Sequence, residues 1–301
     1  MNKIYFAMAL ASLTVVACSN NDDMMSDGAS GELVTIASVG VGEASTRAIT
    51  GENKLVETDL ALFIDDADDK YKANSERWLH TTAEGWQFQP TLDDSKQVYW
   101  KGGSVVWRVC SPSSFSPNTT SVQSVAAVIA DEDDYNGSDL LWGNGTATAR
   151  ELDITLQHAM TRLDVNLIKG TSLEGKAIES INIPDAYTSF DNNAATANSL
   201  AEVSSVLSGS KGTLKTKYQQ TPPAGFDESY TTIFVPQTLA PFTLQVVTTD
   251  NSVYTLELPT FTFEAGKRYT LDLQVGQDLV QLGGIQAADW NVVDAGTLET
   301  E

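Results

Sequence analysis

Short runs in which apolar and polar residues alternate recur along this chain, and they constrain its fold more than any other feature. The run 151–158 places Leu152, Ile154 and Leu156 on one side, and the run 162–168 repeats the spacing. Successive side chains of a β-strand point to opposite faces of a sheet, so this spacing predicts half-buried strands. Helical periodicity is nearly absent, and many short strands separated by turns are typical of antiparallel β-sandwiches. We therefore expect an all-β fold.

Turn signals in the C-terminal half support this expectation. The alternating runs 242–247 and 252–258 flank the tetrapeptide Thr-Thr-Asp-Asn at 248–251, which predicts a β-hairpin. The segment 261–275 is expected to form a strand, an Ala-Gly turn and a second strand.

The N-terminus carries the features of an export signal. Lys3 supplies a positive charge, and residues 4–17 are apolar apart from Ser12 and Thr14. A run of about 14 residues has the length of a secretory signal sequence, whereas a membrane-spanning helix needs roughly 20 residues. We expect residues 1–17 to be a signal peptide.

Cys18 follows this run directly, and Val-Val-Ala-Cys at 15–18 resembles the lipobox of bacterial lipoproteins. Only a thiol can form the thioether to a diacylglyceryl group, and several acyl chains give stable anchoring. The Ser-Asn-Asn-Asp-Asp at 19–23 resembles the export tag of surface lipoproteins of the Bacteroides group. We expect a lipid on Cys18, display on the cell outer membrane, and no intramolecular disulfide to Cys110.

The division of the chain follows from these signals and from a loop-like segment, Lys-Gly-Thr-Ser-Leu-Glu-Gly at 169–175, that marks a domain boundary. We expect a signal peptide over 1–17, a lipidated tether with an N-terminal strand over 18–47, one β-sandwich over 48–172 and a second over 173–301.

Charge and motif content exclude several classes of function. A net charge of −22 repels phosphate backbones, so nucleic acid is not an expected partner. The chain has only two histidines and no recognised catalytic motif, so we expect neither an enzyme nor a cofactor or metal. The acidic runs 65–69 and 131–134 lack the Gly and distal Glu of an EF-hand, and we interpret them as solvated loops, with calcium binding left open.

Two stretches carry candidate site residues. Arg47-Ala48 lies in the polar segment 44–50 and is accessible to an arginine-specific protease. Trp78 and Trp86 flank a loop-like segment and are candidates for stacking on a sugar, whereas Trp100 and Trp107 are expected in core strands.

Several segments, taken in order along 10–291, together resemble the fimbrillins of Bacteroidales. After the lipobox and its acids come one strand and Ser-Thr-Arg-Ala. There follow Asp-Leu-Ala-Leu-Phe-Ile at 59–64, Asp-Leu-Leu-Trp at 139–142, Leu-Gln-His-Ala-Met-Thr-Arg-Leu-Asp-Val at 156–165, Phe-Glu-Ala-Gly-Lys-Arg-Tyr-Thr-Leu at 263–271 and Gly-Ile-Gln-Ala-Ala-Asp-Trp-Asn at 284–291.

The resemblance implies a pilin or accessory fimbrial subunit with two tandem transthyretin-like β-sandwich domains. It also implies that an arginine-specific protease cuts after Arg47, that the first strand leaves, and that a strand of another fimbrial subunit fills the groove, a form of β-augmentation. The removable strand would carry Leu33, Val34, Ile36 and Val39, with Leu33, Thr35, Ala37 and Val39 on one face and Val34 and Ile36 on the other.

Two alternatives stay open. The C-terminal segment 291–301 is polar, and Asp278–Leu282 is a better donor strand, so a stalk, tip or anchor role is not decided. The rival interpretation is a monomeric surface glycan-binding lipoprotein, with Trp78 and Trp86 as the candidate ligand aromatics. A host or bacterial surface glycan or protein is also a candidate partner.

Overall fold

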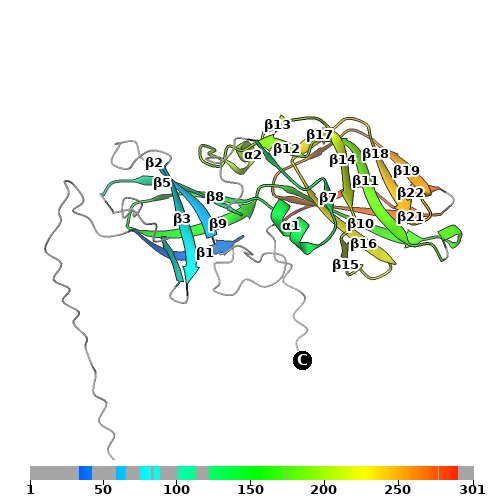
Figure 1. Ribbon diagram of the computed structural model, residues 1–301, viewed down its shortest axis with the longest axis horizontal. Coiled ribbons are helices and arrows are strands. Elements are labelled where there is room, and N and C mark those ends of the chain that lie inside the picture. The colour runs from blue at the N-terminus through cyan, green and yellow to red at the C-terminus, as the bar shows by residue number, and fades with distance from the viewer. Residues whose placement is uncertain are drawn as a thin grey trace, which may run out of the picture.

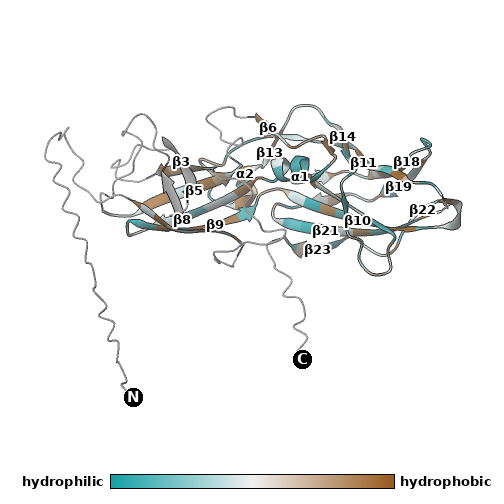
Figure 2. Ribbon diagram, turned by 60° about the horizontal axis from the view of Figure 1, so that its bottom comes forward, coloured by the Kyte–Doolittle hydropathy of each residue, from teal (hydrophilic) through white to brown (hydrophobic). Residues whose placement is uncertain are grey.

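The structure is a computed structural model that describes residues 34–42, 59–65, 75–82, 85–88, 100, 102–112, 122–173, 175–276 and 278–290. The described elements are almost all strands, with two short α-helices, α1 (Glu132–Ser138) and α2 (Leu200–Val203), and a 3-10 helix, η4 (Thr171–Leu173). Figure 1 shows two lobes side by side along the long axis, and Figure 2 shows that α1 is hydrophilic and that hydrophobic stretches run along strands of both lobes. The expected all-β fold is confirmed. No helix within the described ranges has the length and hydropathy needed to cross a membrane.

The first lobe, here called the N-lobe, is built on one seven-stranded sheet. The strand order is β1-β9-β8-β5-β2-β3-β4, and only the β1–β9 pair is parallel among the pairings described for this sheet. These strands are β1 (Thr35–Val41), β2 (Asp59–Asp65), β3 (Ser75–Thr82), β4 (Gly85–Phe88), β5 (Val105–Ser111), β8 (Leu141–Ala147) and β9 (Glu151–His158).

The N-lobe sheet is creased between β8 and β9. The described pairing joins these strands at two positions only, Leu141 with His158 and Trp142 with Gln157. Beyond them β9 folds over the face of the sheet, where its alternate residues share a core with β2 and β5. This N-lobe core consists of Val34, Val41, Leu60, Leu62, Ile64, Val105, Trp107, Val109, Leu141, Ala147, Leu152, Ile154 and Leu156.

Two glycines of β8 allow this close packing. A Cβ atom on Gly143 would collide with the backbone carbonyl oxygen of Thr155 in β9, and one on Gly145 would lie 2.5 Å from Cζ2 of Trp107. Any larger residue at either position would force the backbone or the indole ring to move. Gly143 therefore allows the close approach of β9, and Gly145 leaves room for the indole of Trp107.

The second lobe, here called the C-lobe, is a β-sandwich. One layer has the order β15-β16-β10-β21-β22, with β23 also paired to β21, and the other has the order β19-β18-β11-β14-β7. A single apolar core lies between them, with residues of β10, β11, β16, β18 and β21. The bounds are β7 (Val128–Ile129), β10 (Thr161–Lys169), β11 (Ile178–Ala186), β14 (Gly212–Thr216), β15 (Gln219–Gln220), β16 (Glu228–Phe234), β18 (Phe242–Thr248), β19 (Val253–Leu258), β21 (Lys267–Val275), β22 (Leu279–Gln281) and β23 (Gln286–Asp289).

Both C-terminal turn predictions are confirmed. β18 and β19 pair as an antiparallel hairpin, from Phe242 opposite Leu258 to Val247 opposite Val253. β20 (Phe261–Phe263) and β21 flank the Ala-Gly turn but enter different sheets, because β20 pairs with β17 (Gln237–Leu239).

The chain passes from the N-lobe sheet to the C-lobe between β9 and β10, and this point does not coincide with the boundary expected between residues 172 and 173. β10 lies inside the C-lobe, where it pairs with β16 and β21. The segment 122–138, between β5 and β8, also crosses to the C-lobe, since β6 (Val122–Ser124) pairs with β12 (Ser189–Asp191), which in turn pairs with β13 (Val206–Ser208), and β7 pairs with β14. A connection within a domain has the same composition as a linker between domains. Lys169 ends β10, and Thr171–Leu173 forms a short 3-10 helix after it.

The two lobes meet at a third apolar cluster, here called the junction. Trp142 Nε1 donates a hydrogen bond to Ala194 O at 2.9 Å, and Arg108 Nε donates to Ala197 O at 2.7 Å. Residues of β2 alternate between two cores. Leu60, Leu62 and Ile64 lie in the N-lobe core, and the residues between them lie in the junction. The junction consists of Ala61, Phe63, Cys110, Val125, Leu140, Trp142, Ala159, Met160, Phe190, Ala194, Ala197, Val203, Ile233, Val235 and Trp290.

The crease predicts a specific effect of one methyl group. Gly143→Ala should lower the free energy of unfolding by about 1–3 kcal/mol, the usual cost of overpacking, because the new Cβ collides with Thr155. Gly137→Ala, in α1 with no atom within 4 Å of the new Cβ, is the matched control and should be neutral or slightly stabilising. Denaturant unfolding of both variants checks this, and equal stability of the two would contradict the crease.

Candidate assembly site at the edge strand β1

β1 is the edge strand of the N-lobe sheet next to β9. It runs parallel to β9, from Thr35 opposite Glu151 to Val41 opposite Leu156. Backbone hydrogen bonds at the two ends, from Thr35 N to Arg150 O at 2.9 Å and from Gly42 N to Leu156 O at 2.8 Å, hold it there. Its other edge approaches β4 to within 8 Å between Cα atoms. Thus β1 and β4, the first and last strands of the sheet order, lie close to each other.

A bulge in β1 determines which of its side chains face the core. Ile36 pairs with Leu152 and Ser38 pairs with Asp153, so Ala37 is an extra residue. Val34 and Val41 are buried, at 5% and 2% exposure, and Ile36 and Val39 are half-buried against the same core. The expectation that Val39 shares a face with Thr35 and Ala37 is wrong, because the bulge shifts the alternation by one residue.

β1 is held mainly by its apolar face. Full burial of a Val side chain contributes about 1.5–3 kcal/mol, and Val34 and Val41 both reach full burial. Parallel pairing contributes slightly less per residue than antiparallel pairing, and the bulge interrupts it further. Strand β1 thus fits the N-lobe core well while its backbone pairing is incomplete.

The remaining predicted site residues are distributed as follows. Cys18, Leu33, Arg47 and Ala48 lie outside the described residues. Residues 79–82, expected in a loop, form the end of β3, and Gly85 begins β4, so the register places Trp78 opposite Ala61 and Trp86 opposite Thr81. The two tryptophans are not paired with each other. Trp107 lies in the N-lobe core as expected, and Trp100 packs against it.

The alternative donor segment 278–282 is part of the C-lobe of its own subunit. Leu279–Gln281 forms β22, which pairs with the end of β21, and Leu279 is buried in the C-lobe core. Use of this segment as a donor strand would require it to leave that core.

His158 continues the buried face of β9, and its ring contacts a carboxylate. Nδ1 lies 2.8 and 2.9 Å from the two carboxylate oxygens of Asp139, and the ring stacks on Trp290 with centroids 3.9 Å apart and planes 6° apart. Trp290 N donates to Gly266 O at 2.9 Å. This group joins the end of β9 to the C-terminal segment. The imidazole is closed to a substrate, because it is only 1% exposed.

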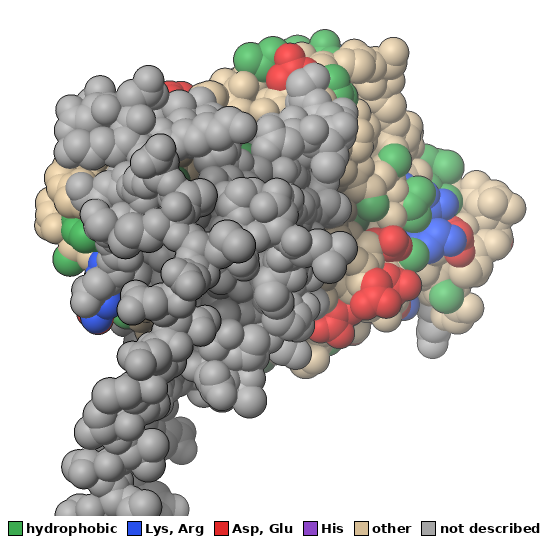
Figure 3. All heavy atoms as spheres, turned by 60° about the vertical axis from the view of Figure 1, so that its left-hand side comes forward, with side chains coloured by type: hydrophobic (Ala, Val, Ile, Leu, Met, Phe, Trp, Pro, Cys, Tyr) green, Lys and Arg blue, Asp and Glu red, His purple; other side chains and the backbone are tan. Residues whose placement is uncertain are grey.

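The acidic run 131–134 caps a helix. Asp131 accepts a hydrogen bond from Asp134 N at 3.0 Å, and the Asp134 carboxylate accepts one from Ala130 N at 3.0 Å. Within the described ranges, no group of three or more His, Cys, Asp or Glu could hold a metal ion. Figure 3 shows acidic side chains gathered on the described surface beside a smaller basic group, as the net charge of −22 leads one to expect.

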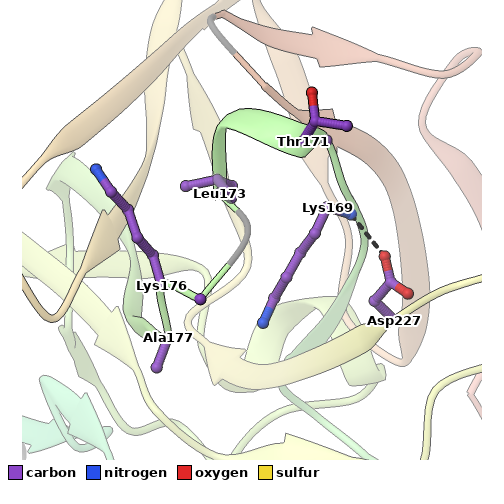
Figure 4. A pocket seen from close by; sticks show the side chains of 8 residues that line it. Lys169, Thr171, Leu173, Lys176, Ala177 and Asp227 are labelled. Atoms are coloured by element: carbon purple, nitrogen blue, oxygen red, sulfur yellow. Dashed lines mark hydrogen bonds between the residues drawn. The ribbon is translucent and has the colours of Figure 1, made fainter.

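A hollow of about 640 Å³ lies between the β10–β11 loop and Asp227, lined by Lys169, Gly170, Thr171, Leu173, Gly175, Lys176, Ala177 and Asp227 (Figure 4). Its two lysines already have carboxylate partners: Lys169 pairs with Glu228, and Lys176 Nζ lies 2.8 Å from Asp250. The hydrogen bond from Lys176 is the main cause that lowers the pKa of Asp250, and the same bond raises the pKa of Lys176. The Lys176–Asp250 pair therefore stays charged near neutral pH, which makes it neither a general acid nor a general base.

The chain belongs to the fimbrillin-like family, whose model matches residues 46–290. The expected resemblance to fimbrillins is therefore confirmed over the body of the chain. No curated protein matches this chain.

Solved structures with the same fold come from Bacteroides species. A protein from Bacteroides ovatus assigned to cell adhesion has a TM-score of 0.63 at 15% identity, covering 88% of this chain and 99% of that one. A cell-adhesion assignment also applies to a protein from Bacteroides uniformis, with a TM-score of 0.60, 15% identity and coverage of 84% and 98%. A fimbrial protein from Bacteroides vulgatus has a TM-score of 0.52, 11% identity and the same coverage. These likenesses establish the fold.

The burial of Val41 predicts how β1 responds to charge. Val41→Asp places a carboxylate in the N-lobe core, so β1 should open more often and its backbone amides should exchange with solvent at least roughly tenfold faster. Thr35→Asp adds the same charge on the exposed side of the same strand and should have little effect. Hydrogen exchange followed by mass spectrometry checks both variants, and equal acceleration would mean that the apolar face does not hold β1.

Proposed function

We propose that this protein is a structural and adhesive subunit of a fimbrium, or pilus. It is exported as a lipoprotein, cleaved after Arg47 and assembled by donor-strand exchange. The observation that carries the proposal is the position of β1: an edge strand that completes the N-lobe core and ends at Val41, shortly before Arg47 in the sequence.

Cleavage changes the connection of β1 to the rest of the chain. Before the cut, β1 is covalently joined to the body that follows Arg47. After it, the strand is held by noncovalent contacts, which among the described residues include its pairing with β9 and the packing of Val34, Ile36, Val39 and Val41. A segment held only by such contacts leaves at a rate set by their strength, so the cut converts a permanent strand into an exchangeable one.

Loss of β1 creates the site for the next subunit. It uncovers the free edge of β9 and side chains facing the N-lobe core, including Leu152, Ile154 and Leu156. Exposed apolar groups beside unpaired backbone groups favour the addition of another strand. A strand of a neighbouring subunit in this groove restores both the backbone pairing and the core, and so links subunits into a filament.

The lipidated cysteine and the cleavage site both precede the body of the protein in the sequence. Cys18 and β1 both precede Arg47, so one cut separates the mature body from its lipid anchor and from β1. The precursor would therefore be held at the outer membrane by Cys18, and the cut product would enter the fimbrium. An arginine-specific protease is the required partner.

Removal of the cleavage site tests the assembly proposal. With an arginine-specific protease, the wild-type precursor should lose residues up to Arg47 and form higher assemblies in size-exclusion chromatography and electron microscopy. Arg47→Ala should remain uncut at this bond and monomeric. Arg47→Lys keeps the positive charge without the arginine side chain, and it should behave like Arg47→Ala if cleavage rather than charge is needed.

Two results would contradict this account. Normal polymerisation of Arg47→Ala would exclude the bond as the switch. A wild-type product that is cut after Arg47 yet stays monomeric would favour the alternative function, a monomeric surface glycan-binding lipoprotein.

The lipid attachment gives an independent prediction. In cells labelled with a radioactive or clickable fatty acid, the wild-type precursor should carry the label and fractionate with the outer membrane. Cys18→Ser should carry none, because serine cannot form the thioether. Cys110→Ser, which changes the buried cysteine of the junction, is the control and should keep the label. Label on Cys18→Ser would show that the anchor lies elsewhere.

A further inference from the structure

The β1 bulge has two opposing effects on how the strand is held. It places Val34 and Ile36 before the bulge, and Val39 and Val41 after it, against the same core. It also leaves Ala37 without a partner on β9, in the middle of the strand. Bulges disrupt the local hydrogen-bond ladder and are rare in parallel pairs.

The surroundings of Ala37 compensate for little of this loss. Ala37 is exposed, and Ser38 Oγ next to it donates a hydrogen bond to Asp153 Oδ1 at 2.9 Å on the exposed side. A regular strand in the same groove would keep the apolar contacts and gain an uninterrupted ladder. Such a strand needs apolar side chains at every second position, opposite Leu152, Ile154 and Leu156.

We propose that the bulge at Ala37 makes β1 a temporary occupant of its groove. The groove releases the bulged strand faster than it would release a regular strand. The preferred occupant is an extended segment without a bulge, with apolar residues at alternate positions. This inference deepens the proposed function, on which it rests for its biological meaning, and it concerns the regulation of the same site.

The register provides a direct way to remove the bulge. Ile36 pairs with Leu152 and Ser38 with Asp153, so deletion of Ala37 makes these two pairs consecutive. Val39 stays opposite Ile154 and Val41 opposite Leu156. The deletion therefore repairs the ladder while the inward side chains keep their partners.

The first test measures the opening of β1 in the uncut full-length chain, so it does not depend on cleavage or assembly. The Ala37 deletion should slow hydrogen exchange of the β1 amides roughly five- to tenfold, the effect of about one net hydrogen bond. Deletion of Ala29, in the segment before β1, is the control and should leave the exchange unchanged. Exchange of β1 in the Ala37 deletion as fast as in wild type, or faster, overturns the proposal.

The second test uses synthetic peptides and covers the case in which the deletion disturbs folding. Wild-type protein cut after Arg47 is offered two peptides, residues 33–42 with and without Ala37. The peptide without Ala37 should stay bound roughly five- to tenfold longer. Equal retention of the two peptides overturns the bulge proposal, whereas selective retention without filament formation would reject donor-strand assembly and leave the role of the bulge intact.

Discussion

The N-lobe depends on the burial of one face of β9 against the sheet of β2 and β5. Leu152, Ile154 and Leu156 are almost fully buried, although β9 shares only two paired positions with β8. Since backbone pairing on that side is so limited, β9 depends on its apolar contacts and on β1 along its other edge. The N-lobe core thus requires a strand in the β1 position with apolar side chains facing inward.

The rest of the molecule does not share this dependence. The C-lobe core, as far as the structure describes it, contains no residue of β1. The junction joins the lobes through a separate set of side chains, and segment 122–138 crosses between them. Loss of β1 would therefore open the N-lobe and leave the sandwich of the C-lobe intact. In the proposed function, this separation lets β1 be exchanged while the rest of the body stays fixed.

The sequence predicted the fold class and the strand in front of Arg47, because period-2 alternation depends only on which face is buried. It did not predict the bulge, since an extra residue in one strand is defined by its partner, and β9 lies more than a hundred residues further along the chain. The stack of His158 on Trp290 has the same origin, as no local pattern links these positions. The change of sheet falls before residue 172, because β10 belongs to the C-lobe and segment 122–138 pairs with C-lobe strands, and this is a property of topology rather than of composition.

The central claim is that the β1 position is filled from within the chain before cleavage and by a neighbouring subunit afterwards. A high-resolution electron cryo-microscopy map of the assembled filament tests it most directly. The account predicts that residues up to Arg47 are absent and that a strand of another subunit lies along β9, facing Leu152, Ile154 and Leu156. A filament in which each subunit keeps its own residues 35–41 paired with β9 would contradict it.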